Sequence, residues 1–130
     1  MPASFEEAEF VAREHLEGEL ERGVEKSKKR GREERKRRLE KANPRPSAIQ
    51  IISWGFRRNP DVIAEVLERA QGKCECCHRD APFLRAKDGS PYLEAHHKIP
   101  LSRGGEDTVE NTIAVCPNCH MELHYGMKAP

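Results

Sequence analysis

The stretch EAHHKIPLSRGGEDTVENTIAVCPNCHMELH, residues 94–124, decides the fold of this 130-residue chain. It holds four of the six histidines, Asn111 and a pair of cysteines in CxxC spacing. Histidines and cysteines at short, regular spacing are typical of metal sites in small domains. Metal chemistry is therefore the first interpretation to examine, and the other segments are interpreted around it.

The five cysteines include two CxxC pairs, Cys74 with Cys77 and Cys116 with Cys119. In a reducing compartment this spacing indicates zinc rather than disulfides, because two pairs can complete a tetrahedral thiolate site. The expected zinc is structural and stabilises a small core. Because the first pair reads Cys-Glu-Cys-Cys, Cys76 is an alternative ligand, although the spacing favours Cys77.

The histidines form a second set with a different geometry. His120 and His124 are four residues apart on an expected helix, so they lie on one face and can share an ion. His96 and His97 are neighbours on an expected strand and point to opposite sides of it. One of these two can therefore bind a metal ion while the other stays outside the ligand set and acts as a base.

Apolar spacing and turn residues predict the elements that carry these side chains. Asn59 and Pro60 are typical of an N-cap and a first helical position, and the apolar stripe after them ends at Gly72. The apolar run over 48–56 is too short to assign to strand or helix. The expected elements are a helix over 4–24, a helix over 60–71, a strand over 92–99, a loop over 100–107, a strand over 112–115, and a final helix that Gly126 ends.

The combined pattern resembles a known family. The residues that carry the likeness are the run Glu94-Ala95-His96-His97-Lys98-Ile99-Pro100, the pair Gly104-Gly105, Asn111, and the run Cys116-Pro117-Asn118-Cys119-His120. They resemble the motif of the HNH endonucleases, most closely the cysteine-bearing branch with McrA-like restriction nucleases. The likeness covers about residues 58–126. It implies an α+β fold: a small ββα-metal, treble-clef-like domain with a structural four-cysteine zinc site, preceded by a charged helical extension.

This resemblance assigns roles residue by residue. His97 matches the general base that activates water, and Asn111 matches the residue that fixes the loop and orients that base. His120 matches a metal ligand, with His96 as its partner from the strand and His124 where many relatives have a third ligand. The implied catalytic residues are His97, Asn111 and His120, and the implied products carry 5′-phosphate and 3′-hydroxyl ends. Mg²⁺ or Mn²⁺ is the expected ion in the cell, although imidazole ligands favour Ni²⁺, Co²⁺ or Zn²⁺.

The formal net charge of +1 conceals a strong segregation of charge. Residues 1–25 carry eight acidic and two basic side chains, whereas residues 26–41 carry ten basic and three acidic ones. The basic segment has almost no apolar face, so a solvated helix or a disordered arm is expected. It is interpreted either as a plain linker or as an arm that contacts DNA phosphates. The candidate DNA-contacting residues are Lys28, Lys29, Arg30, Arg35, Arg37 and Arg38, with Arg103 in the loop between the strands.

Proline residues mark the expected boundary between two parts. The run Asn43-Pro44-Arg45-Pro46 breaks the helix, because proline lacks a backbone donor and restricts the residue before it. The expected parts are a charged helical arm over 1–43 and the nuclease domain over 44–130. Trp54 and Phe56 follow the boundary, and packing in the core is favoured for them over stacking on a base.

These observations favour a metal-dependent endonuclease that hydrolyses DNA, with double-stranded DNA as the expected partner and a homodimer as a candidate assembly. The alternatives are a catalytically inactive, zinc-containing module that binds nucleic acid, and a nuclease that acts on RNA. An inactive module leaves the nuclease-like spacing of His96, His97, Asn111 and His120 unexplained. The sequence shows no apolar run long enough to cross a membrane and no secretory leader, so a cytoplasmic location is expected.

Overall fold

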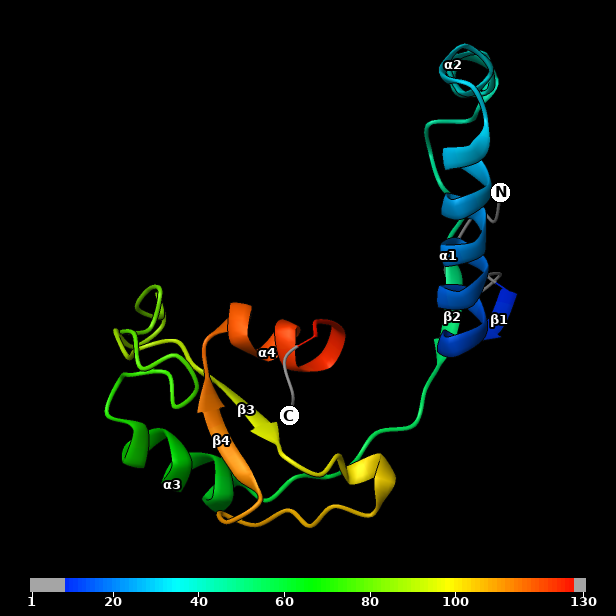
Figure 1. Cartoon of the computed structure of the whole chain (residues 1–130). Helices are drawn as coiled ribbons and strands as arrows, with labels where there is room; N and C mark the ends of the chain where they lie inside the picture. Colours follow the sequence, from blue (N-terminus) through cyan, green and yellow to red (C-terminus); the bar gives the residue numbers. More distant parts are fainter. Residues whose placement is uncertain (1–8, 128–130) are drawn as a thin grey trace. The chain divides into compact units, whose positions relative to one another are not determined.

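The computed structural model of the chain describes residues 9–127. The chain divides into two compact units, Met1–Gly55 and Phe56–Pro130 (Figure 1). Both helices and strands are present, which confirms the predicted α+β class. The extents proposed for the functional domains, 1–43 and 44–130, stay a prediction. No helix within the described residues is long and apolar enough to cross a membrane.

The second unit contains an antiparallel pair of strands and two helices. Strand β3 (Glu94–His97) pairs with β4 (Thr112–Val115). Helix α3 (Pro60–Ala70) contacts both strands, and α4 (Pro117–Tyr125) follows β4 and contacts β3 (Figure 1). A short 3-10 turn, η2 (Leu101–Arg103), lies in the loop between the strands. The order of two strands and a helix after the first cysteine pair is the predicted one, although β3 is shorter than expected.

Helix α3 begins where its capping residues predict. The Asn59 side chain accepts a hydrogen bond from the backbone N–H of Asp61 at 2.9 Å, and Pro60 is the first helical residue. The buried residues of the helix are Val62 and Val66, and Val66 has no exposed surface. Burial of a valine side chain contributes about 1.5–3 kcal/mol. This apolar face therefore anchors α3 on the sheet.

The core of the second unit is small and includes sulfur atoms. Its buried residues are Val66, Cys74, Leu93, Ala114, Val115 and Cys119. Two of the six are cysteines, one from each CxxC pair, so the hydrophobic core and the cysteine cluster are parts of one structure. A core of this size rarely stabilises a domain without a further cross-link.

A pair of charged side chains joins α3 to the first cysteine pair and to β4. The Arg69 guanidinium donates hydrogen bonds to both carboxylate oxygens of Glu75, at 2.8 and 2.7 Å, and to the Thr112 carbonyl at 2.8 Å. Glu75 also accepts a hydrogen bond from the backbone N–H of Ala114 at 2.9 Å. The contact with Arg69 is the main reason why the pKa of Glu75 lies below its usual range.

The first unit contains a parallel pair of short strands and two helices. Strand β1 (Glu9–Ala12) pairs with β2 (Ile49–Ile52), and the helices are α1 (Arg13–Lys29) and α2 (Arg32–Lys41). Neither helix has a buried residue. The basic segment over 26–41 is therefore a solvated helix interrupted near Gly31, which is one of the two predicted forms.

The helix predicted over 4–24 is wrong in its N-terminal part. Residues 9–12 form a strand and the helix begins at Arg13, while residues 4–8 lie outside the described residues. Val11 is aligned with Ile51 in the parallel pair. Apolar and β-branched residues on both strands favour this pairing, and a distant partner in the sequence outweighs the local helical spacing.

The prediction that Trp54 and Phe56 pack in the core is also wrong. Trp54 is 96% exposed and Phe56 is 60% exposed. Every residue from 51 to 60 is exposed, and the part from 53 to 59 has no regular structure. The segment therefore offers no packed face in which these rings could be buried.

Replacing Arg69 with alanine should lower the free energy of unfolding by about 1–3 kcal/mol, because Glu75 and the Thr112 carbonyl lose charge-assisted hydrogen bonds together. Chemical denaturation in the presence of metal measures the change. Arg57→Ala, at an exposed position, is the control and should change stability by less than about 0.5 kcal/mol. Equal stability of Arg69→Ala and wild type would contradict a structural role for the pair.

Candidate active site

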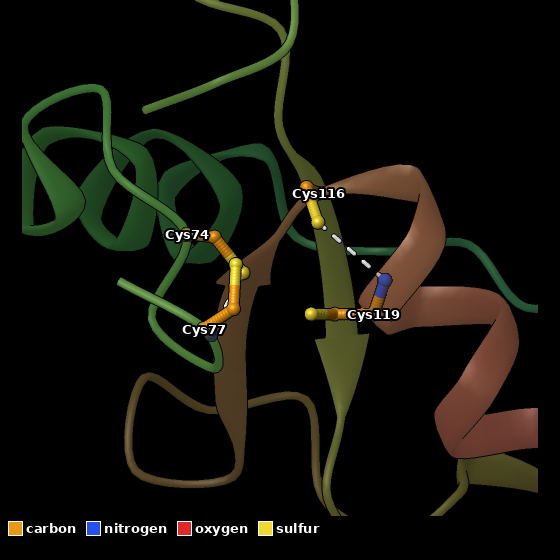
Figure 2. A group of neighbouring side chains, drawn as sticks. All are labelled: Cys74, Cys77, Cys116 and Cys119. Atoms are coloured by element: carbon orange, nitrogen blue, oxygen red, sulfur yellow. Dashed lines mark hydrogen bonds between the residues drawn. The ribbon is translucent and has the colours of Figure 1, made fainter. Parts of the chain in front are cut away.

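Four cysteines from two distant segments form a cluster at the C-terminal end of β4. Their sulfur atoms all lie within 4.8 Å of one another, and the four residues are Cys74, Cys77, Cys116 and Cys119. Figure 2 shows the first pair, from the turn after α3, facing the second pair, at the junction of β4 and α4. This is the predicted set, and it contains Cys77 rather than Cys76. The cluster could hold a metal ion.

Backbone N–H groups surround the sulfur atoms. The Cys74 sulfur accepts hydrogen bonds from the backbone N–H groups of Cys76 and Cys77, each at 3.4 Å, and the Cys116 sulfur accepts one from Cys119 at 3.4 Å. Burial acts to raise the pKa of Cys74, but the backbone N–H groups outweigh it and lower the pKa to about 6. Burial raises the pKa of Cys119. A cation among the four sulfur atoms would stabilise the thiolate form of this buried thiol as well.

Three histidines form a second cluster beside the sheet. His96 comes from β3, and His120 and His124 come from successive turns of α4. One ring nitrogen of each lies within 4.8 Å of the others, and the Nε2 atoms of His120 and His124 are 3.1 Å apart. The structure thus brings together the three predicted ligands of a divalent cation.

The burial of His96 supports a ligand role. The residue is 5% exposed, and its Nε2 is buried without a hydrogen-bond partner in the described part of the chain. An unpaired buried polar atom costs about 1–3 kcal/mol, and a cation at this cluster would satisfy it. Burial, followed by the neighbouring histidines, lowers the pKa of His96. The ring therefore stays neutral, which is the form that binds a metal.

Glu94 orients His120 within this cluster. The Nδ1 of His120 lies 2.8 Å from one carboxylate oxygen of Glu94, and the Tyr92 hydroxyl donates a hydrogen bond to the other oxygen at 2.6 Å. The Tyr92 hydroxyl is the main cause that lowers the pKa of Glu94. Because an ionised carboxylate only accepts, the proton of a neutral His120 is on Nδ1, and its Nε2 carries the lone pair that can bind a metal.

Neither Glu94 nor Tyr92 was predicted from the sequence to have a role in the site. Glu94 and His96 are two residues apart on β3 and share one face of it, and Tyr92 precedes Glu94 by the same spacing just before the strand begins. This period of two is the signal that could have identified them.

His97 lies outside the histidine cluster and has a carboxylate partner of its own. Its Nε2 is 2.8 Å from Oδ1 of Asp107, and the two side chains are 11% and 22% exposed. The other oxygen of Asp107 accepts a hydrogen bond from the backbone N–H of Asn59 at 2.6 Å. Asp107 was missed in the sequence, where no spacing rule connects it to His97.

Asn111 fixes the loop between β3 and β4. Its side-chain oxygen accepts a hydrogen bond from the backbone N–H of Ile99 at 2.9 Å. Its amide nitrogen donates to the carbonyls of Ile99 and Glu106, at 3.0 and 2.7 Å. The loop is tight: a Cβ at Gly105 would lie 1.9 Å from the Ile99 carbonyl oxygen, so only glycine fits. The side chain of Asn111 thus contacts the loop after His97 rather than the His97 ring.

The predicted base and the predicted ligands line one open cleft of about 340 Å³. Its wall includes His96, His97, His120 and His124, together with Phe56, Arg58 and Ser102. Arg103 is exposed and follows Ser102 directly. The cleft therefore combines a cluster able to bind a cation, a separate imidazole and a nearby arginine.

The other predicted DNA contacts lie in the first unit. Lys28, Lys29, Arg37 and Arg38 are exposed, whereas Arg30 and Arg35 are half-buried. Lys28 pairs with Glu25 at 3.1 Å, and Arg35 donates a hydrogen bond to the Ser27 carbonyl at 3.0 Å, near the end of α1. Part of the arm's positive charge is thus engaged within the arm itself.

Residues 74–126 match the profile of the HNH endonuclease family. Residues 74–126 are named the HNH region after this match. The match includes both cysteine pairs, β3, β4 and α4 of the HNH region, and it confirms the resemblance found in the sequence.

A curated relative of the HNH region is the type IV methyl-directed restriction enzyme EcoKMcrA of Escherichia coli (strain K12). It is 48% identical over 85 residues, which are 65% of this chain and 30% of that enzyme. The family match and this relative support the predicted enzyme class.

Two solved structures are also similar. The type IV phosphorothioation-dependent restriction endonuclease ScoMcrA is 38% identical, with a TM-score of 0.47, over 55% of this chain and 14% of that one. The modification dependent TagI restriction endonuclease is 26% identical, with a TM-score of 0.45, over 58% of this chain and 26% of that one. The chain spans less than a third of the length of each of these three relatives.

Cys119→Ser should remove metal from the cysteine cluster of the HNH region and lower Tm by more than about 10 °C, because a buried cross-link of the core is lost. Cys76→Ser is the matched control and should keep both the metal content and Tm. Metal analysis of purified protein and a thermal scan measure the two effects. If Cys76→Ser lost as much metal as Cys119→Ser, Cys76 would be the ligand in place of Cys77.

Proposed function

We propose that this chain is a metal-dependent HNH endonuclease that hydrolyses phosphodiester bonds in DNA. The observation that carries this proposal is the cleft beside β3, where three histidines converge and a fourth lies next to them with its own carboxylate partner. Phosphodiester hydrolysis needs a base for the attacking water and positive charge near the phosphate. The cleft has residues suited to each requirement.

His96, His120 and His124 would hold the catalytic cation. Three imidazoles suit Ni²⁺, Co²⁺ or Zn²⁺ better than Mg²⁺, which prefers oxygen ligands and water, and Mn²⁺ lies between these preferences. The unpaired Nε2 of His96 and the contact of Glu94 with His120 support this assignment. When bound, the cation supplies positive charge to the scissile phosphate and to the leaving oxygen.

The cysteine cluster would hold Zn²⁺ in a structural role. Four thiolates complete a tetrahedral site and leave no position open for a substrate. The burial of Cys74 and Cys119 in the core supports this separation of a structural site from a catalytic one.

His97 would act as the general base. Its ring takes a proton from a water molecule, whose oxygen forms a bond to phosphorus while the bond from phosphorus to the 3′ oxygen breaks. The 3′ oxygen takes a proton from solvent, and the products carry a 5′-phosphate and a 3′-hydroxyl end. Asn111 would keep the loop after His97 in place through its three backbone hydrogen bonds.

DNA is the favoured substrate class because the relatives described above are restriction enzymes. Their names refer to methylated, phosphorothioated or otherwise modified substrates, so modified duplexes belong in a substrate panel with unmodified DNA and RNA. The exposed Arg58 at the cleft and Arg103 beside it would contact phosphates near the cleavage point. Double-stranded DNA as partner, a homodimer and a cytoplasmic location stay predictions.

His97→Ala should reduce plasmid cleavage at least about 100-fold, because general-base catalysis contributes about 10²–10⁴ to the rate. DNA binding and metal content should stay close to wild type, because His97 is outside the ligand set. Cleavage is measured with EDTA and with added Mg²⁺, Mn²⁺, Ni²⁺ or Zn²⁺, beside the exposed-histidine control His15→Ala.

Two outcomes would change the assignment. A His97→Ala protein that cuts at the wild-type rate would reject His97 as the base. A wild-type protein that shifts DNA on a gel but cuts under no metal would instead support the inactive binding module.

Replacing the exposed Lys28, Lys29, Arg37 and Arg38 with glutamine should weaken DNA binding and make it less sensitive to salt. Each lost phosphate contact reduces the slope of log K against log salt by about 0.9, so the slope should fall by up to about 3.6. Glutamine keeps helix propensity, and the double change Glu33→Gln with Glu34→Gln is the control. An unchanged slope would show that the arm is a linker.

A further inference from the structure

We propose that Asp107 is a positioning residue that fixes the tautomer of His97, and that the start of α3 in turn fixes Asp107. This inference rests on the proposed nuclease function, in which His97 is the base. It assigns a role to a side chain outside the cysteine and histidine sets, and it connects the cleft to a backbone amide at the N-terminus of a helix.

The first step concerns the proton of the His97 ring. Its Nε2 is 2.8 Å from Oδ1 of Asp107. An ionised carboxylate can only accept a hydrogen bond, so Nε2 must carry the proton that is shared with it. A neutral ring has one N–H, and Nδ1 is therefore the nitrogen with a free lone pair. Since His97 lines the cleft, Nδ1 is the atom available to take a proton from water.

The second step concerns the orientation of the carboxylate. Its Oδ2 accepts a hydrogen bond from the backbone N–H of Asn59 at 2.6 Å. Asn59 is also the N-cap of α3, so its backbone position is set by the helix. Both oxygens of Asp107 are thus engaged, one by a fixed backbone donor and one by the imidazole. The hydrogen bond from Asn59 is also the main cause that lowers the pKa of Asp107, which keeps this group ionised.

This arrangement has a consequence for the reaction. When Nδ1 takes the proton of the attacking water, the ring becomes an imidazolium with a proton on each nitrogen. The proton on Nε2 stays there, and its hydrogen bond to the carboxylate becomes a bond between two charged groups, which is stronger. Asp107 remains ionised throughout and stabilises the charge that develops on His97.

An asparagine at position 107 separates this role from a structural one. The backbone N–H of Asn59 needs an acceptor, so the amide oxygen of Asp107→Asn would take that side and its NH₂ group would face His97. That group can only donate, so Nε2 would have to accept and the ring proton would move to Nδ1. The variant would keep the shape of the site but place a proton on the atom that has to act as the base.

The test compares Asp107→Asn with Asp107→Ala in the full chain. Asp107→Asn should lower the cleavage rate by up to about 10⁴, as expected for a wrong tautomer. Asp107→Ala should lose less activity, because the His97 ring is then unrestrained and still samples the active tautomer. In stability, by contrast, Asp107→Asn should be closer to wild type than Asp107→Ala. A purely structural role predicts that Asp107→Ala is worse in both measurements, and that result would overturn the inference.

A spectroscopic readout makes the test independent of activity. Two-bond ¹H–¹⁵N correlation spectra of the Zn²⁺-loaded protein report which nitrogen of His97 is protonated. Wild type and the control Asp88→Asn, in a turn outside the cleft, should show the proton on Nε2, and Asp107→Asn should show it on Nδ1. An Nδ1 proton in wild type, or no change in Asp107→Asn, would reject the role of Asp107. If wild type shows the expected tautomer but cuts no DNA, the nuclease proposal fails and the positioning of His97 stands.

Discussion

The close approach of four cysteine sulfur atoms is the constraint on which the HNH region depends. It joins the turn after α3 to the junction of β4 and α4, two segments that are far apart in the sequence. Cys74 and Cys119 are also members of the small apolar core. Closing a long loop has an entropic cost that so few apolar contacts offset poorly. The position of α4, and with it that of two of the three clustered histidines, therefore follows from the sulfur cluster.

The pleat of β3 places two adjacent histidines in different surroundings, so that one can bind a cation while the other can act as a base. His96 is buried and its Nε2 has no hydrogen-bond partner in the described part of the chain, whereas His97 contacts Asp107 from the loop. Each side has its own carboxylate, since Glu94 holds His120. Neither carboxylate belongs to the group of three nitrogen donors. The candidate cation site is thus built from imidazole nitrogens, and the Glu94 carboxylate contacts one of these ligands from outside the group.

Much of the second unit could be predicted because its signals are local. The two CxxC pairs, the four-residue spacing of His120 and His124, and the Asn59 cap of α3 each depend on residues close together in the sequence. The contacts that were missed join distant segments. Asp107 meets both His97 and Asn59 only after the loop has folded against the start of α3. No periodicity in the sequence encodes such a meeting.

The errors in the first unit have the same origin. The spacing around Val11 fits a helix, and only the pairing with Ile51 reveals a strand. Trp54 has a large aromatic side chain of the kind found in protein cores, yet it lies in an exposed segment. Composition and spacing report what a segment could form by itself, and tertiary contacts decided the outcome here.

Cys119 and His120 are neighbours on α4 but belong to different clusters. Each residue added to an α-helix turns the following side chains by about 100°. One residue inserted between these two would therefore leave the sulfur cluster intact while turning His120 and His124 away from His96. The same insertion in β3 would exchange the two faces of the strand. Substitutions on the outer surface of α4 are compatible with this arrangement, whereas any change in the length of the run from Cys116 to His124 is not.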